Sequence, residues 1–180
     1  MMVPATAVAG AIVFGMANGA IAASFAVSGQ TFKVEASRLE GDGFKQYGGV
    51  VVEKDGTTHP VAVSEIASAE LYDLCQSVKH PKLPVVLTIN AGGGGDPATA
   101  TGLLIDMERL EGDAKFTEIK IGRDATDLNA KAEAKSFGQS ADHVTITGLQ
   151  QVARSTSAAV FTLKGLKLGI AVGADAKECF

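Results

Sequence analysis

Apolar and polar residues alternate along most of the chain after residue 24. Phe32, Val34 and Ala36 show the pattern, since each is separated from the next by one residue of another kind. A period of two places such residues on one face of a β-strand. Further short apolar runs, bounded by Gly, Asp, Asn or Pro, occupy residues 50–52, 61–63, 85–89, 116–121, 144–146 and 160–168.

Helical composition is rare in this part of the chain. Residues 128–136, with Ala and Lys, form the one convincing helical stretch after the N-terminal segment, and it is short. The 21 glycines also favour turns and tight strand connections over long helices. The pattern therefore predicts a mainly β fold: an antiparallel sandwich, a barrel or a β-solenoid.

The N-terminal segment has a different pattern. No charged residue occurs before Lys33, and residues 4–23 are almost entirely apolar, with Pro4 suited to the first turn of a helix. Twenty helical residues span about 30 Å, the thickness of a bilayer core. Residues 20–23 also fit a signal-peptide cleavage site, but no basic residue precedes the stretch, which is long for a signal peptide. We expect a retained transmembrane helix or signal-anchor over residues 1–23 and an extracytoplasmic β-rich domain over residues 24–180.

Gly15 and Gly19 lie four residues apart in this apolar segment. Small residues at that spacing share one helix face and let two helix backbones approach closely. The pair indicates helix–helix packing, although a segment rich in Gly and Ala also produces such a pair by chance.

The sequence Arg-Leu-Glu-Gly-Asp occurs twice, at residues 38–42 and 109–113. Each copy follows a partly apolar stretch and precedes a Phe, which predicts a strand, a Gly-Asp turn and a second strand. Two equivalent coils of a solenoid or a duplicated half-domain would explain the repetition.

Charge and cysteine content narrow the class of protein. The net charge is −4, and no basic patch suited to nucleic acid is visible, so that partner is set aside. The two cysteines, Cys75 and Cys179, are expected to form a disulfide in an exported chain. Such a bridge would tie the C-terminus to the middle of the domain.

The motifs of catalytic and cofactor sites are missing from the sequence. The glycines of residues 92–95 are not followed by Lys-Ser or Lys-Thr, so they predict a loop between strands and not a phosphate site. No G-x-S-x-G elbow, C-x-x-C or H-E-x-x-H sequence is present, and His59, His80 and His143 are scattered. We therefore predict no catalytic, cofactor or metal-binding residues.

Several segments resemble an uncharacterised family of actinobacterial exported proteins. They are Ala-Ser-Phe-Ala-Val-Ser-Gly-Gln (23–30), Lys-Gln-Tyr-Gly-Gly (45–49), Leu-Cys-Gln-Ser (74–77), Ala-Gly-Gly-Gly-Gly (91–95), Ile-Gly-Arg-Asp-Ala (121–125) and Glu-Cys-Phe (178–180). The resemblance covers nearly the whole chain and implies an exported, β-rich protein with a hydrophobic N-terminal segment. Some members of the family are labelled cholesterol esterase.

These observations favour a non-enzymatic cell-envelope protein at the membrane, with its main domain outside the cytoplasm. Gly15 and Gly19 suggest that it self-associates or serves as an accessory subunit of a membrane assembly. The first alternative is a lipid-binding or lipid-transfer protein, because apolar strands can line a lipid groove, although the same residues also suit an ordinary core. The second alternative is a lipid esterase. The expected partners are membrane lipid, a second copy or a membrane protein.

Overall fold

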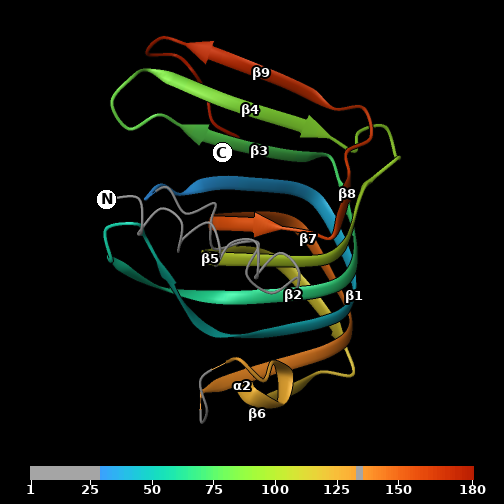
Figure 1. Ribbon diagram of the computed structural model, residues 1–180. Helices are drawn as coiled ribbons and strands as arrows, with labels where there is room; N and C mark the ends of the chain where they lie inside the picture. The colour runs from blue at the N-terminus through green and yellow to red at the C-terminus, as the bar shows by residue number, and fades with distance from the viewer. Residues whose placement is uncertain (1–28, 133–135) are drawn as a thin grey trace.

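The computed structural model describes residues 29–132 and 136–180, which form a mainly β structure (Figure 1). The expected helix of residues 1–23, with Gly15 and Gly19, lies outside the described residues. A short helix, α2 (Ala125–Leu128), separates β6 from β7. The strands are β1 (Phe32–Val52), β2 (Thr58–Tyr72), β3 (Leu74–Lys79), β4 (Val85–Ala91), β5 (Ala98–Thr117), β6 (Lys120–Asp124), β7 (Phe137–Ser157), β8 (Val160–Thr162) and β9 (Lys167–Val172).

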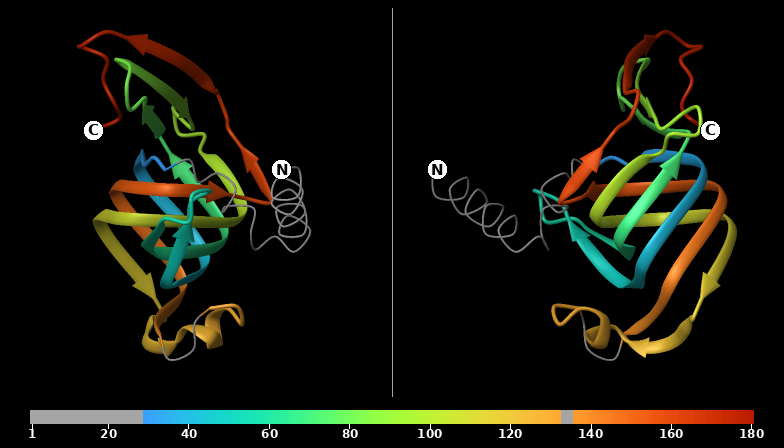
Figure 2. Two further views of the ribbon diagram at one scale, coloured as in Figure 1. Left: turned by 60° about the vertical axis from the view of Figure 1, so that its left-hand side comes forward. Right: turned by 90° about the vertical axis from the view of Figure 1, so that its right-hand side faces the viewer.

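The strands form one antiparallel sheet in the order β6-β7-β5-β2-β1-β3-β4-β9, with β8 paired to β5. Because β7 also pairs with β1, the long strands β1, β2, β5 and β7 form a closed circuit of neighbours. Strands β3, β4 and β9 continue the sheet beyond this circuit (Figure 2). The prediction of a mainly β, antiparallel fold is confirmed, but the molecule is not a clean barrel. Antiparallel pairing in every ladder also differs from the stacked parallel coils of a β-solenoid.

The two Arg-Leu-Glu-Gly-Asp segments do not form the predicted turns. The first lies inside β1 and the second inside β5, on either side of β7. Gly112 has a φ of 148° at a register shift between β5 and β7, whereas Gly41 is paired on both sides, with Ala69 of β2 and Val144 of β7. The turn prediction was wrong because pairing with neighbouring strands keeps both copies within a single β-strand.

The predicted helix is also displaced along the chain. Residues 128–136 have helical composition, but the helix observed is residues 125–128, and residues 129–132 are not helical; residues 133–135 lie outside the described residues. The observed helix begins at Ala125 because Asp124 is its N-cap: an Oδ1 of Asp124 accepts hydrogen bonds from the backbone N–H and the hydroxyl of Thr126, at 2.9 and 2.7 Å.

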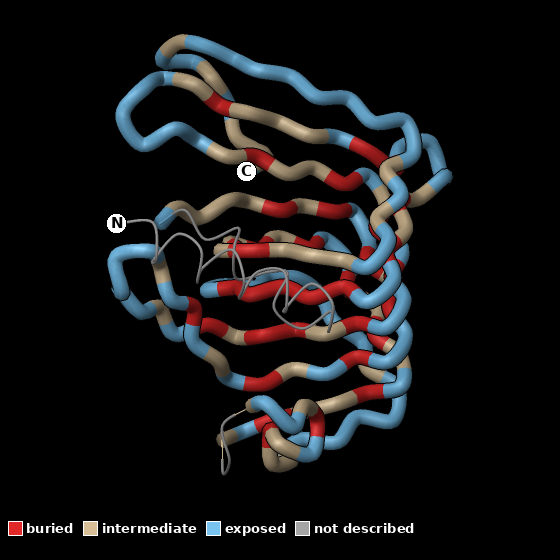
Figure 3. The backbone as a smooth tube through the Cα atoms, in the orientation of Figure 1, coloured by how far each residue is buried: buried red, intermediate tan, exposed pale blue. Residues whose placement is uncertain are grey.

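The core is formed mainly by the buried faces of β1, β2, β5 and β7, and consists largely of small and branched apolar side chains. In β7, Val144, Leu149 and Ala153 are fully buried in the larger of two apolar clusters. Figure 3 shows buried and exposed positions alternating along the strands, as the period of two predicts. The aromatic rings of Phe44 and Phe116 pack on this cluster with their centroids 5.4 Å apart.

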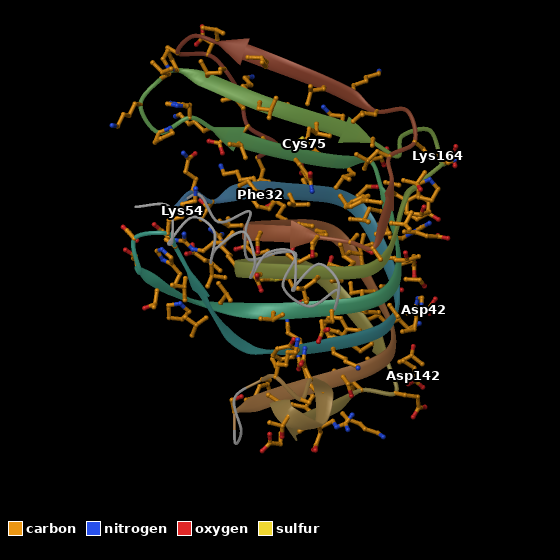
Figure 4. All side chains as sticks on the ribbon, viewed as in Figure 1. Phe32, Asp42, Lys54, Cys75, Asp142 and Lys164 are labelled. Atoms are coloured by element: carbon orange, nitrogen blue, oxygen red, sulfur yellow. A yellow bond between two sulfur atoms is a disulfide. The ribbon has the colours of Figure 1, made fainter. Side chains whose placement is uncertain are left out.

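The long strands bend along a line that crosses three of them. Gly43 of β1, Ala67 of β2 and Gly102 of β5 are each skipped in the ladders between these strands. Both glycines have a positive φ, +69° and +59°. Asp42 lies beside this line, at the rim of the molecule where the strands turn (Figure 4). The bend gathers polar side chains from different strands on the outside of the corner.

Candidate functional site

Strands β3, β4 and β9 and the C-terminal tail form a distinct part of the molecule, which we call the C-terminal wing (residues 74–91 and 164–180). Cys75 of β3 and Cys179 of the tail form a disulfide, as expected from the sequence, with their Cα atoms 5.9 Å apart. The backbone N–H of Cys179 donates to the hydroxyl of Ser77 at 2.9 Å. These bonds hold the tail against the sheet (Figure 4).

The tail shields one face of the wing. Ser77 and Val86 of this face are almost completely buried. Lys33 of β1 also holds the tail, because its ammonium group donates to the backbone carbonyl of Phe180 at 2.6 Å and lies 3.3 Å from the carboxylate of Glu178. These covalent and polar contacts hold the tail over the β3 and β4 part of this face.

The opposite face of the wing is apolar and open. Cross-strand partners in an antiparallel ladder share a face. The register pairs Val85 with Val172, Leu87 with Ile170 and Ile89 with Leu168. The β9 members of these pairs are 73%, 68% and 64% exposed, respectively. Figure 3 shows β9 exposed along its whole length.

The wing also ends in a free edge. β9 is the last strand in the sheet order and pairs with β4 alone among the described strands. An edge strand presents unpaired backbone groups, and proteins usually protect it with charged residues. The opposite edge, β6, is protected in this way by Lys120 and Arg123, whereas β9 has one charged residue, Lys167, at its start.

A second candidate site is a polar groove at the bend of the long strands. Its lining includes Glu40 and Asp42 of β1, Ser68 and Glu70 of β2, and His143 of β7. Threonines of β5 complete one wall. The groove is open to solvent, and three of its lining residues are acidic.

His143 is the centre of this groove. Its Nδ1 lies 2.7 Å from an Oδ1 of Asp42 and its Nε2 lies 2.7 Å from an Oε2 of Glu40. These two hydrogen bonds raise the pKa of His143 above its usual value, since both favour the imidazolium form. The hydroxyl of Thr145 donates to Glu40 and, together with the imidazolium, lowers the pKa of that carboxyl group.

The groove lacks the geometry of a serine hydrolase. A hydrolytic triad needs a histidine with one nitrogen free to accept the proton of the serine hydroxyl. Ser68 and His143 line the same groove, but both ring nitrogens of His143 contact carboxylates. The imidazole of β7 is therefore held between two carboxylates of β1 and has no nitrogen to act as a base toward Ser68.

The other chemically interesting residues of the sequence are not brought together. His59 contacts Glu53 near the β1–β2 turn, and His80 lies in the β3–β4 turn. The glycine-rich run joins β4 to β5 as the predicted loop, with positive φ at Gly92, Gly94 and Gly95. Within residues 29–132 and 136–180, no cluster of His, Cys, Asp or Glu has the arrangement of a metal site.

Sequence reasoning missed both the open face of the wing and the groove. A signal for the first was present, because Leu166, Leu168, Ile170 and Val172 alternate with small residues or Lys. The alternation suggests a strand with one apolar face but does not reveal whether another layer covers it. Glu40 and Asp42 stand in the repeated segment, yet no local pattern connects them to His143, which lies about a hundred residues further along.

Comparisons with known proteins place the chain in a family without assigning an activity. Residues 28–180 match a family described as a family of unknown function, DUF6230. No curated protein and no solved structure matches the chain. In the part of the chain that the structure describes, no helix is both long and apolar enough to cross a membrane.

Proposed function

This chain belongs to DUF6230, and on that premise we propose that it is a non-enzymatic, membrane-anchored cell-envelope protein that docks through its C-terminal wing. The observation that carries the proposal is the open apolar face of β9, where Leu168, Ile170 and Val172 are each more than 60% exposed. Large apolar side chains gathered on one exposed surface mark an interaction site in a folded protein.

Two further features support this proposal. The disulfide between Cys75 and Cys179 suits an oxidising compartment, and hence the extracytoplasmic side of a membrane. The apolar residues 4–23 would place the domain beside that membrane, and Gly15 and Gly19 would let two such helices pack together. The wing would then meet its partner, in a self-associated form or in a larger assembly, close to the lipid surface.

Controlled release of the domain tests the docking function. A protease site inserted between residues 28 and 29 of the full chain allows cleavage after folding, in isolated native membranes. We expect the released domain to remain bound to wild-type membranes, because the wing holds it there. In the double variant Leu168→Ser/Ile170→Ser, the released domain should appear in the supernatant after sedimentation.

The matched control is Val50→Ser/Val52→Ser. These valines are 59% and 54% exposed near the β1–β2 turn, so the control removes similar apolar groups outside the wing. Its released domain should stay with the membranes. Immediate loss of the wild-type domain after cleavage, at the same rate as the double variant, would refute docking through the wing.

A further inference from the structure

The charge of the wing identifies a partner for its apolar face. The wing carries five lysines, at positions 79, 82, 164, 167 and 177, and two acidic residues, Asp175 and Glu178. The whole chain, in contrast, has a net charge of −4. One of the two acidic residues, Glu178, is already paired with Lys33 of β1. The open apolar face therefore belongs to a basic part of an acidic protein.

Two of these lysines stand in the segments that border the apolar face at its two ends. Lys82 lies in the β3–β4 turn, which lies beside the end of β9 because the N–H of Gly173 donates to the carbonyl of Pro84 at 2.8 Å. Lys164 lies at the other end, just before β9 begins (Figure 4). Lys79 and Lys167 lie on the tail-covered face, because the register pairs them with Val86 and Asn90. None of these four side chains forms an ion pair with another described residue.

An apolar surface bordered by unpaired lysines is the arrangement of proteins that lie on a bilayer. The apolar groups enter the boundary between headgroups and acyl chains, and long lysine side chains reach the anionic headgroups. We propose that the wing docks on the surface of an anionic lipid bilayer, with Leu168, Ile170 and Val172 in the interface. This inference rests on the proposed docking function and names its partner.

A second copy of the chain explains the wing less well. Antiparallel pairing of β9 with the β9 of a second copy would satisfy the free edge, but it would also extend the open apolar face. It would bring together two wings of the same positive charge as well. An anionic lipid surface covers the apolar face and neutralises the lysines in one contact.

Tryptophan fluorescence tests this contact directly, because the chain contains no Trp. The variants Ile170→Trp and Ile121→Trp each introduce a single fluorophore. The two isoleucines are similarly exposed, 68% and 65%, and they lie on β9 and β6, the strands at opposite ends of the sheet order. Ile121→Trp is thus the matched control for an exposed edge position outside the wing.

Each full-length variant is reconstituted into vesicles of brominated phosphatidylcholine, with or without phosphatidylglycerol. Bromine on the acyl chains quenches a Trp that enters the lipid. We expect Ile170→Trp to be quenched several-fold more than Ile121→Trp, and mainly when phosphatidylglycerol is present. Adding Lys82→Glu and Lys164→Glu should raise several-fold the phosphatidylglycerol content needed for half of the quenching, whereas Lys120→Glu on β6 should leave it unchanged.

Three results would overturn the inference: equal quenching of the two tryptophans, quenching of Ile170→Trp that is insensitive to both phosphatidylglycerol and the lysines, or no quenching at all. A shift of the Ile170→Trp emission to shorter wavelength without quenching would show that protein covers β9. That result removes the lipid contact and leaves docking through the wing intact, whereas failure of the release experiment in native membranes removes docking itself.

Discussion

At the scale of single residues, His143 is the most informative side chain. It contacts two carboxylates of the neighbouring strand β1, and these contacts favour the imidazolium form of His143. The link has its full strength only when His143 is protonated and both Glu40 and Asp42 are ionised.

The pH dependence of stability follows from the directions of the two pKa shifts. The pKa of His143 is raised, so its contribution is fully present below its unfolded value, about 6.5, and is lost as pH rises through the folded value. The pKa of Glu40 is lowered, so its contribution is lost as pH falls through that lowered value. The contacts of His143 with Glu40 and Asp42 are therefore strongest at mildly acidic pH, above the pKa of Glu40 and below that of His143.

We predict that His143→Gln is less stable than the wild type in that range, by less than about 1 kcal/mol because the site is partly exposed. The difference should shrink as the pH becomes alkaline. Denaturant unfolding of the full chain in detergent at a series of pH values measures it. His80→Gln, in the exposed β3–β4 turn, controls for the loss of a histidine as such. A stability difference that is constant across pH would contradict this dependence on the protonation of His143.

At the scale of the element, the bend depends on residues without large side chains. Gly43 has a φ of +69°, a conformation that strains any residue with a Cβ. An added Cβ would also lie 2.9 Å from the Cβ of Ala67 on the adjacent strand. Both effects oppose the substitution of Gly43. Asp42 and His143 pair directly beside this bend.

Gly43→Ala is predicted to destabilise the protein by about 1–3 kcal/mol, the usual cost of a strained backbone conformation. Gly48→Ala is the matched control in the same strand, because Gly48 has an ordinary negative φ and no atom within 4 Å of its ideal Cβ position. It should be neutral or slightly stabilising. Chemical denaturation compares the two variants, and equal stabilities would mean that the bend does not depend on Gly43.

At the scale of the whole molecule, the disulfide joins parts of the chain 104 residues apart. It fixes the C-terminal tail over one face of the wing, and that leaves the opposite face as the surface available to a partner. The bridge also restricts the unfolded chain, which stabilises the folded state.

The double variant Cys75→Ala/Cys179→Ala should lose about 2–4 kcal/mol of stability, the typical effect of a disulfide that closes a long loop. Its tail should also become sensitive to protease. Denaturation with and without reductant provides the control, because reductant should lower the stability of the wild type and leave the variant unchanged. Identical unfolding midpoints for the oxidised wild type and the variant would show that the bridge does not stabilise the fold.

The sequence by itself determined the class of secondary structure, the two cysteines available for a bridge and the loop at residues 92–95. These follow from local physics: the period of two, the chemistry of Cys and the conformational freedom of Gly. It also predicts an apolar N-terminal helix, which lies outside the described residues. Local rules failed at Gly41, since a Gly-Asp pair favours a turn until strands on both sides pair with it.

Only the tertiary structure decided which apolar residues are buried and which distant polar residues meet. Val144 and Ile170 both stand in apolar, alternating segments, yet one is fully buried and the other is 68% exposed. The reason is position in the sheet, since β7 lies between β1 and β5 whereas β9 is an edge. The contact of His143 with Glu40 and Asp42 likewise depends on the pairing of β1 with β7, a long-range register that no local sequence pattern encodes.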